Sequence, residues 1–385
     1  MHKTTQQCYG LAVADQILTA TLPRTRSARR SPGIAEAVEA ALTIFVSDES
    51  AALVALDPAL EPLVNAVRDA VLGGGKRLRP LFAFWGWRAN GGDGQVVPVL
   101  PALSALELLH AFALIHDDVM DRSDTRRGLP TAHRSLAAAH SRAGLRGEAL
   151  RFGDAAAILA GDLCLVWADR LMGQAQVPPS RLAAARRAYD QMRVEAVAGQ
   201  FLDILGDCSP TWTVERALRT ARLKTAGYTV VQPLHFGSVL AGPVDPMLSA
   251  ALTRYGVQVG EAFQLRDDLL GAFGDPAVTG KPVGDDLAQG KPTVLLQLAR
   301  ARLGHQGQSE LDRLRRDCSR EGTDGASARN QLADLVHGTG AADAVQQMIA
   351  ERVGGARDVV ASLPLDREVH QALTGLAETA AWRSA

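Results

Sequence analysis

Residues 101–121 read PALSALELLHAFALIHDDVMD, and this pattern predicts a long apolar helix that ends in acid. Asp117 and Asp121 are four residues apart, so a helix places them on one face, with side chains about 6 Å apart. Asp118 flanks them, and residues 108–115 just before are apolar apart from His110. Three carboxylates in this spacing repel one another unless a cation bridges them. The stretch therefore predicts an acidic cluster at the mouth of an apolar wall.

A second acidic pair, Asp267-Asp268, follows about 150 residues later inside FQLRDDLL, residues 263–270. Carboxylates are costly to bury unless a positive group meets them. Two such clusters in a largely helical chain suggest facing walls of one cavity that holds divalent cations. Gln264 lies three residues before Asp267, on nearly the same helix face, and is expected to be its hydrogen-bonding neighbour.

Basic residues near both clusters indicate a ligand more anionic than the carboxylates. Lys76 and Arg79 stand at a glycine loop that leads into a helix, which is a natural anion site. Lys281 and Lys291 each follow a glycine in a loop suited to closing over phosphate. The full set is Lys76, Arg79, Arg126, Arg127, Lys224, Lys281 and Lys291. Magnesium prefers carboxylate, phosphate and water oxygens, so magnesium plus diphosphate is the simplest ligand that satisfies both kinds of residue.

Composition narrows the class of protein. The chain has 385 residues, of which 47% are hydrophobic, and a formal net charge of −1, which gives no electrostatic case for nucleic-acid binding. Four cysteines without CxxC spacing indicate reduced thiols and a cytoplasmic protein. No apolar run reaches the roughly 18 residues of a membrane span, so no transmembrane segment is predicted.

The pattern predicts one all-α domain over residues 34–385. Residues 1–33 are basic and rich in Ser and Thr, and are expected to form a disordered extension, with an organelle-targeting peptide as the alternative. Residues 135–152 are expected to be a polar connection and residues 272–292 a Gly/Pro-rich loop, and no strand is predicted. The predicted helices are 34–71 (interrupted near Pro58 and Pro62), one with Pro80 in its first turn, 101–121, 155–172, 180–205, 214–240 and 246–270.

These residues together resemble the trans-isoprenyl diphosphate synthases, or polyprenyl synthetases, over about residues 34–376. The matching strings are GGKRLRP (74–80), ELLH (107–110), DDVMD (117–121) with RRG (126–128), GD (161–162), GQ (199–200) with Asp203, KT (224–225), FQ (263–264) with DD (267–268), and GK at 280–281 and 290–291. The resemblance implies a single-domain helical bundle around a deep central active-site cavity. It also implies a homodimer that condenses isopentenyl diphosphate head-to-tail with an allylic diphosphate.

The resemblance assigns roles to individual residues. Asp117, Asp118 and Asp121 are expected to hold magnesium, and Asp267 and Asp268 a further ion, giving about three ions per active site. The expected ligands of the allylic diphosphate are Arg126, Lys224 and Lys281, and those of isopentenyl diphosphate are Lys76, Arg79, His110 and Arg127. Lys291 is expected to help close the loop. The Thr225 hydroxyl, the Gln264 amide and the Lys224 carbonyl are expected to stabilise the allylic carbocation.

One position departs from the family pattern, and another bears on product length. The second acid motif often ends in Asp at its fifth place, where this chain has Gly271, so the third ion depends on Asp267 and Asp268, with Asp285 or Asp286 able to help through water.

Phe112 lies five residues before Asp117, about 7.5 Å deeper along the helix, and Ala113 lies beneath Asp117. By resemblance, one large residue at the fifth position favours geranylgeranyl diphosphate (C20) over farnesyl diphosphate (C15).

Two other classes of protein share part of this pattern. A class I terpene cyclase has the first acid motif but lacks the isopentenyl diphosphate set Lys76, Arg79, His110 and Arg127. A catalytically silent partner subunit typically loses an acid motif, whereas both are retained here apart from Gly271. Both features favour the active synthase.

Overall fold

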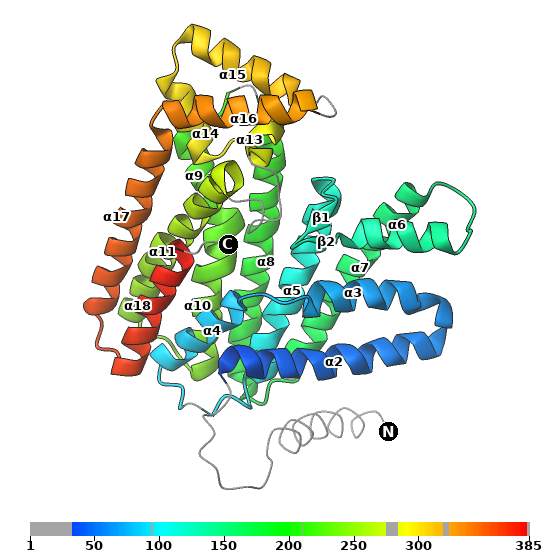
Figure 1. The fold of residues 1–385 in the computed structure, drawn as a ribbon. Helices are drawn as coiled ribbons and strands as arrows, with labels where there is room; N and C mark the ends of the chain where they lie inside the picture. The colour runs from blue at the N-terminus through cyan, green and yellow to red at the C-terminus, as the bar shows by residue number, and fades with distance from the viewer. Residues whose placement is uncertain (1–32, 94, 210, 275–283, 319–322, 383–385) are drawn as a thin grey trace, which may run out of the picture. The chain divides into compact units, whose positions relative to one another are not determined.

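The computed structural model describes residues 33–93, 95–209, 211–274, 284–318 and 323–382. This part of the chain is almost entirely helical, which confirms the all-α prediction (Figure 1). The only strands in this part of the chain are two strands of two residues each, which pair as a hairpin. Apart from Gly33, the predicted extension 1–33 lies outside the described residues, as does Lys281. Across the described ranges, no helix combines the length and apolar character that crossing a bilayer requires.

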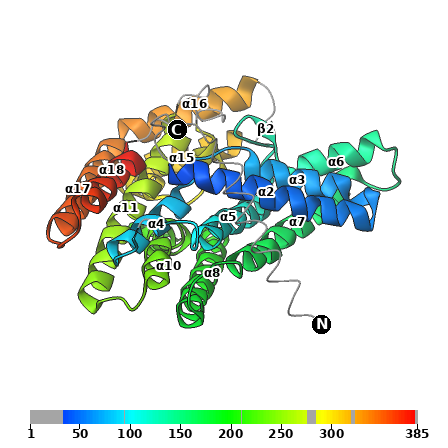
Figure 2. The same cartoon turned by 90° about the horizontal axis from the view of Figure 1, so that it is seen from below.

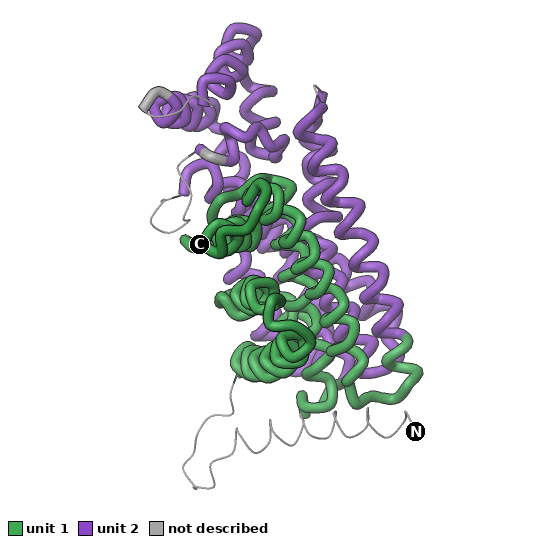
Figure 3. Tube along the Cα trace, turned by 90° about the vertical axis from the view of Figure 1, so that its right-hand side faces the viewer, with its two compact units in different colours: residues 1–84, 92–183 green, residues 85–91, 184–385 purple. Residues whose placement is uncertain are grey.

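The chain forms two compact units, which are described separately below (Figure 3). Unit 1 contains residues 1–84 and 92–183, and unit 2 contains residues 85–91 and 184–385. The first acidic cluster belongs to unit 1 and the second to unit 2. The predicted domain boundary at residue 34 stays a prediction.

Unit 1 is built around the predicted helix of the first acidic cluster. This helix, α5, packs against α7 and also contacts α2 and α3, and Leu103, Leu106 and Leu108 are fully buried on it. The interruption near Pro58 and Pro62 is confirmed by η1 between α2 and α3. The elements are α2 (Ile34–Leu56), η1 (Pro58–Leu60), α3 (Glu61–Leu72), α4 (Leu78–Ala89, which continues into unit 2), α5 (Leu100–Met120), β1 (Thr125–Arg126), β2 (Leu129–Pro130), α6 (Ala132–Arg142) and α7 (Ala149–Met172).

The predicted polar connection at residues 135–152 is wrong. This stretch contains most of α6 and the first turn of α7. The arginines of this stretch suggested a polar connection, but α6 is an amphipathic helix. Its residues Leu136, Ala137 and His140 are buried, while the charged side chains face outward. Alanine-rich segments favour helix, and burial of one face against α7 is enough to stabilise it.

Unit 2 centres on α11, which packs against α17 and α18 (Figures 1 and 2). It also packs against η2. Tyr255 on α11 is fully buried and its hydroxyl donates a hydrogen bond to the Leu373 carbonyl of α18, 2.7 Å away. The elements are α8 (Pro179–Cys208, whose first residues belong to unit 1), α9 (Val214–Ala221), η2 (Arg222–Val231), α10 (Gln232–Ala241), α11 (Pro246–Phe273), α13 (Asp285–Gln289), α14 (Val294–Arg302), α15 (His305–Asp317), α16 (Thr323–Gly338), α17 (Ala341–Ala361) and α18 (Arg367–Ala381).

The single helix predicted over residues 214–240 is wrong in its middle, where η2 is a π-helix. The Gln232 amide reaches back five residues to the Gly227 carbonyl, as this wider turn requires. Neighbouring helices come very close here, since a Cβ on Gly199 of α8 would lie 2.6 Å from Lys224 Cα. The predicted loop 272–292 is also corrected, because α11 extends to Phe273 and α13 forms within the range.

Candidate active site

The first acidic cluster occupies the C-terminal end of α5, as predicted from its spacing. Asp117 and Asp118 lie in the last turn, and Asp121 is the C-cap, its amide donating to the Asp117 carbonyl at 2.8 Å. The Asp118 side chain is only 6% exposed, whereas that of Asp117 is 23% exposed. Burial raises the pKa of Asp118, and hydrogen bonds from Arg126 offset part of that rise.

The β1–β2 hairpin directs its two arginines to different partners. Arg126 forms a two-point ion pair with Asp118, with Nε 2.9 Å from Oδ2 and Nη2 2.7 Å from Oδ1. Arg127 and Gly128 both have positive φ, 53° and 75°, which forms the tight turn between the paired residues Arg126 and Leu129. The turn carries the Arg127 guanidinium to the glycine loop, where it donates to the Gly74 carbonyl.

That glycine loop precedes α4 and carries Lys76. Gly75 has a φ of 145°, which favours glycine, and a Cβ placed on it would lie in tight contact with the Arg127 guanidinium, 3.1 Å from Nη2. Lys76 is exposed and Arg79 is partly buried in the first turn of α4. The structure thus brings Arg127 next to the glycine loop that carries Lys76. Both residues are predicted to bind isopentenyl diphosphate.

His110 completes this basic region of unit 1. Burial, followed by the charges of Arg79 and Arg127, holds the pKa of its imidazole well below the usual range. At neutral pH the ring is therefore neutral and offers one N–H donor rather than a positive charge. The pKa of Arg127 is also lowered, by burial and by the charges of Arg77 and Arg126, and the charge of Glu107 offsets part of that fall.

Sequence reasoning missed the role of Arg77. Its side chain is 6% exposed and lies 2.8 Å from the 4%-exposed carboxylate of Glu107, one turn before His110 on α5. A second pair joins Arg77 to Glu39 of α2 at 2.5 Å. Arg77 also has a positive φ of 49°, a left-handed conformation that is uncommon for a residue with a side chain. These pairs fix the glycine loop against α2 and α5, and no local pattern in the sequence indicates them.

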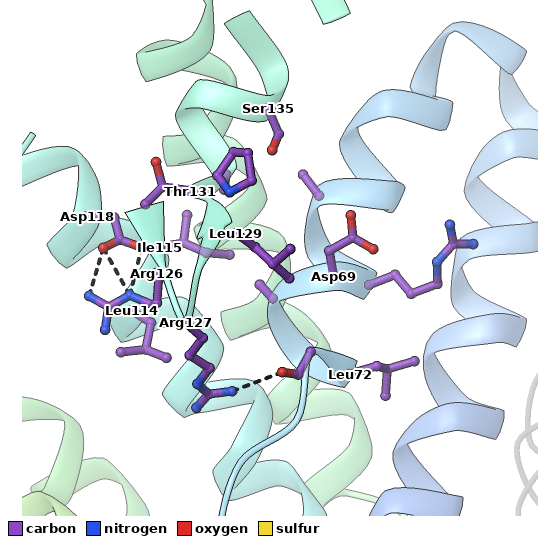
Figure 4. A pocket seen from close by; sticks show the side chains of 16 residues that line it. Asp69, Leu72, Leu114, Ile115, Asp118, Arg126, Arg127, Leu129, Thr131 and Ser135 are labelled. Atoms are coloured by element: carbon purple, nitrogen blue, oxygen red, sulfur yellow. Dashed lines mark hydrogen bonds and ion pairs between the residues drawn. The ribbon is translucent and has the colours of Figure 1, made fainter. Parts of the chain in front are cut away.

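A cavity of about 480 Å³ lies beside the acidic cluster within unit 1 (Figure 4). Its walls are Asp69 and Leu72 of α3, the α5 residues Leu114 and Ile115, and the hairpin residue Leu129. Asp118, Arg126 and Arg127 also line it, so the ion pair of Arg126 borders an open space. Figure 4 shows this ion pair and the contact of Arg127 with the chain after α3.

The predicted chain-length residues lie on α5 beneath the acids, and Phe112 and Ala113 are both partly buried. The Phe112 ring contacts His116, with centroids 4.7 Å apart in an edge arrangement. His116 Nε2 lies 2.9 Å from the Ile158 carbonyl of α7, and a Cβ on Gly161 would collide with the imidazole. Gly161, found in the sequence only as part of a family string, therefore makes room for the side chain that supports Phe112.

In unit 2, the second acidic pair is linked to η2 by a short hydrogen-bond chain. Thr225 Oγ1 donates to Gln264 Oε1 at 2.5 Å, and Gln264 Nε2 donates to Asp268 Oδ1 at 2.9 Å. The acceptor is thus Asp268, four residues on, where the sequence suggested Asp267. Lys224 Nζ lies 2.5 Å from Asp203 Oδ2 of α8. The close approach at Gly199 and the wide turn of η2 place Lys224 and Thr225 for these contacts.

Asp268 is the most strongly perturbed carboxyl of this region. Burial raises its pKa to about 7, and the nearby charges of Asp267, Asp286 and Asp203 add to the rise. Asp203 is paired with Lys224, and the other carboxylates whose charges act on Asp268 are those of Asp267 and Asp286. Lys291 follows α13 and is partly buried.

The comparisons with known proteins agree with this chemistry. A model of the family described as polyprenyl synthetase matches residues 61–330. The chain belongs to the polyprenyl synthetase family. Among relatives, geranylfarnesyl diphosphate synthase of Aeropyrum pernix is 33% identical over 307 residues, covering 78% of this chain and 88% of that protein. Geranylgeranyl diphosphate synthase of Mycobacterium tuberculosis is 38% identical over 231 residues, 60% of each chain.

A solved structure of this family is also similar along nearly the whole chain. Geranylgeranyl pyrophosphate synthase from Corynebacterium glutamicum, complexed with isoprenyl diphosphate and magnesium, is 37% identical, has a TM-score of 0.85, and is matched over 91% of this chain and 98% of its own. The family assignment from sequence is confirmed, and this polyprenyl synthetase is a prenyltransferase of the trans-prenyl diphosphate synthase type.

Magnesium dependence is a property of the family, and the residues present fit this ion. Both acidic clusters offer only carboxylate oxygens, the donors that magnesium prefers. Within the described ranges, no group of three or more His, Cys, Asp or Glu side chains is arranged to hold a metal ion by itself.

Proposed function

We propose that this polyprenyl synthetase condenses isopentenyl diphosphate with allylic diphosphates and forms mainly geranylgeranyl diphosphate. The observation that carries the proposal is the joint presence in unit 1 of the acidic cluster on α5 and the crowded basic region of Arg79, His110 and Arg127. A ligand that brings both cations and multiple phosphate oxygens satisfies the two at once. Diphosphate with magnesium is that ligand.

In this proposal the two kinds of diphosphate are bound by different residues. Asp117, Asp118 and Asp121 of unit 1, and Asp267 and Asp268 of unit 2, hold about three magnesium ions. When bound, magnesium neutralises the negative charge that develops on the leaving diphosphate. Arg126, Lys224 and Lys281 bind the allylic diphosphate, whereas Lys76, Arg79, His110 and Arg127 bind that of isopentenyl diphosphate. Lys291 assists closure, which excludes water.

The carbocation formed as the carbon–oxygen bond breaks needs neutral dipoles with oxygen lone pairs facing it. Thr225 and Gln264 fit this role because the hydrogen bond from Thr225 to Gln264, and that from Gln264 to Asp268, fix their orientation. The π-helix leaves the Lys224 carbonyl in an irregular turn, where it is a further candidate. The double bond of isopentenyl diphosphate then attacks the cation, and loss of a proton to the departed diphosphate restores neutrality.

Product length in this proposal is set by Phe112. Its ring lies one to two turns beneath the acidic cluster and is supported by His116, while the small Ala113 leaves space beside it. One supported ring above an otherwise apolar wall favours C20, with C15 as the shorter alternative. We also propose a homodimer, since Leu150, Ile158, Leu159 and Val166 leave large apolar side chains exposed on α7. We propose a cytoplasmic location, since the free cysteines Cys164, Cys208 and Cys318 fit a reducing compartment.

A product assay tests the proposal directly. The purified protein receives magnesium, radiolabelled isopentenyl diphosphate and, separately, dimethylallyl, geranyl or farnesyl diphosphate, and chain length is determined after dephosphorylation. A dominant C20 alcohol is the expected result. A C15 product would keep the reaction and contradict the role of Phe112, and no elongation from any primer would overturn the proposed function. In the same assay, Asp117→Ala should lower turnover roughly 10²–10³-fold, and near-normal turnover would contradict the metal assignment.

A further inference from the structure

Gly271 stands where the second acid motif of the family often has its last aspartate, and the space next to it is filled. A Cβ built on Gly271 would overlap with Oδ2 of Asp286 and lie 2.6 Å from its Cγ. Real Cβ atoms essentially never approach another atom this closely. No side chain fits at position 271 while Asp286 keeps its place, and the Asp286 carboxylate occupies the position where that side chain would begin.

The position of Asp286 is fixed by its own short helix rather than by chance contact. The Gly284 amide, at the start of α13, donates to the Ala272 carbonyl at the end of α11, 3.2 Å away. Leu287, next to Asp286, is 3% exposed and packs in a cluster with Leu269 and Ala272 of α11. A hydrogen bond and an apolar contact therefore hold α13 against α11 on both sides of Asp286.

The place that Asp286 occupies is one helical turn beyond Asp267. Position 271 is four residues after 267 on α11, so a carboxylate there lies on the same face, about 6 Å from Asp267. The negative charge of Asp286 also acts directly on Asp268. The Asp286 carboxylate therefore lies in the surroundings of both Asp267 and Asp268.

We infer that Asp286 supplies from α13 the carboxylate that Gly271 removes from α11, and so completes the magnesium-binding set of Asp267 and Asp268. This inference rests on the proposed function. The ion keeps several waters, and a carboxylate at this distance from Asp267 binds it either directly or through one of them. The missing aspartate of the motif is in this way replaced by a residue 15 positions further along the chain.

The test measures magnesium binding, not only turnover. Isothermal titration with magnesium and inorganic diphosphate is performed on wild type, Asp286→Asn and Asp286→Ala. Loss of a carboxylate from the set should weaken magnesium binding about ten- to hundredfold. Asp334→Asn removes an exposed charge on α16 of the same unit and should leave the binding unchanged.

Relocating the carboxylate separates this role from a structural one. Gly271→Asp alone should lower both stability and magnesium affinity, because its side chain collides with Asp286. Gly271→Asp combined with Asp286→Ala should restore most of the affinity lost in Asp286→Ala. An acid near the start of α13 could also merely stabilise that helix. In that case Asp286→Asn would lower the melting temperature without magnesium but leave the affinity intact.

The outcomes also distinguish this inference from the proposed function. Wild-type affinity in Asp286→Asn, or no recovery in the double variant, would overturn the inference while wild type still makes product. Absence of magnesium-dependent diphosphate binding in wild type itself would overturn both.

Discussion

Arg126 and Asp118 bind one another through two hydrogen bonds, while Arg126 Nη2 also lies 3.9 Å from Asp117. The guanidinium of Arg126 thus supplies a positive charge next to both acids. Asp118 is almost fully buried, so without Arg126 its charge would lack compensation. Binding of magnesium to Asp118 and of diphosphate to Arg126 should therefore occur together, because each frees the partner of the other.

Arg126→Gln is expected to weaken binding of the allylic diphosphate. Loss of a charge-assisted hydrogen bond corresponds to about 1.5–3 kcal/mol, or a rise in KM of roughly 10–100-fold. Steady-state kinetics with geranyl diphosphate measures the change. Arg134→Gln is the matched control, because Arg134 pairs with the exposed Asp124 and should leave KM unchanged. An unaltered KM in Arg126→Gln would show that the arginine serves only to neutralise Asp118.

Phe112→Ala should lengthen the product, and Ala113→Phe should shorten it. The first removes the ring that His116 supports beneath the acidic cluster, and the second adds a ring one residue nearer to it. Product chain length by radio-chromatography is the readout, with total turnover as the check that each variant is folded. If both variants kept the wild-type product, the floor would lie on other residues.

The raised pKa of Asp268 predicts a pH dependence of the metal-free protein. Since its folded value of about 7 exceeds the ordinary 3.8, the stabilising contribution is fully present below 3.8 and is lost as pH rises through 7. The free energy of unfolding should therefore fall across this window. Magnesium displaces the proton, so its affinity should rise about tenfold per pH unit below 7 and level off above.

Denaturant unfolding and magnesium titration from pH 5 to 8 measure these two effects. Asp268→Asn cannot titrate, so it should level the pH dependence of magnesium affinity and remove only the part of the unfolding slope that Asp268 contributes, because groups such as His110 keep their own. A pH dependence of magnesium affinity that persists in Asp268→Asn would assign the titration to another group.

Arg77→Met should destabilise the protein by about 3–5 kcal/mol, because it leaves Glu107 charged and buried without its partner. The double variant Arg77→Met with Glu107→Leu should recover much of this loss, since no buried charge then remains. Urea unfolding gives the free energies. Arg313→Met, which removes an exposed pair with Glu310, should have a far smaller effect. A small loss in Arg77→Met would show that Glu39 or water compensates Glu107.

Much of the candidate site could be predicted because its signals are local. The i, i+1, i+4 spacing of Asp117, Asp118 and Asp121 places them on one helix end whatever the rest of the chain does. The same holds for Asp267 and Asp268 on α11, and for the glycine loop before α4. The errors came where a local signal was misleading, as in residues 135–152, where arginines on the outer face of a helix resembled a polar connection.

The sequence alone therefore determined the helical class, the family, the two acidic clusters and the basic residues near them, because helical period and motif spacing act over a few residues. Only the tertiary structure decided which side chains became partners. Arg77 meets Glu107 across 30 residues, Thr225 meets Gln264 across 39, and Asp286 fills the place that Gly271 leaves open. Such pairs depend on how separate helices pack, and packing selects among many contacts that the sequence permits equally well.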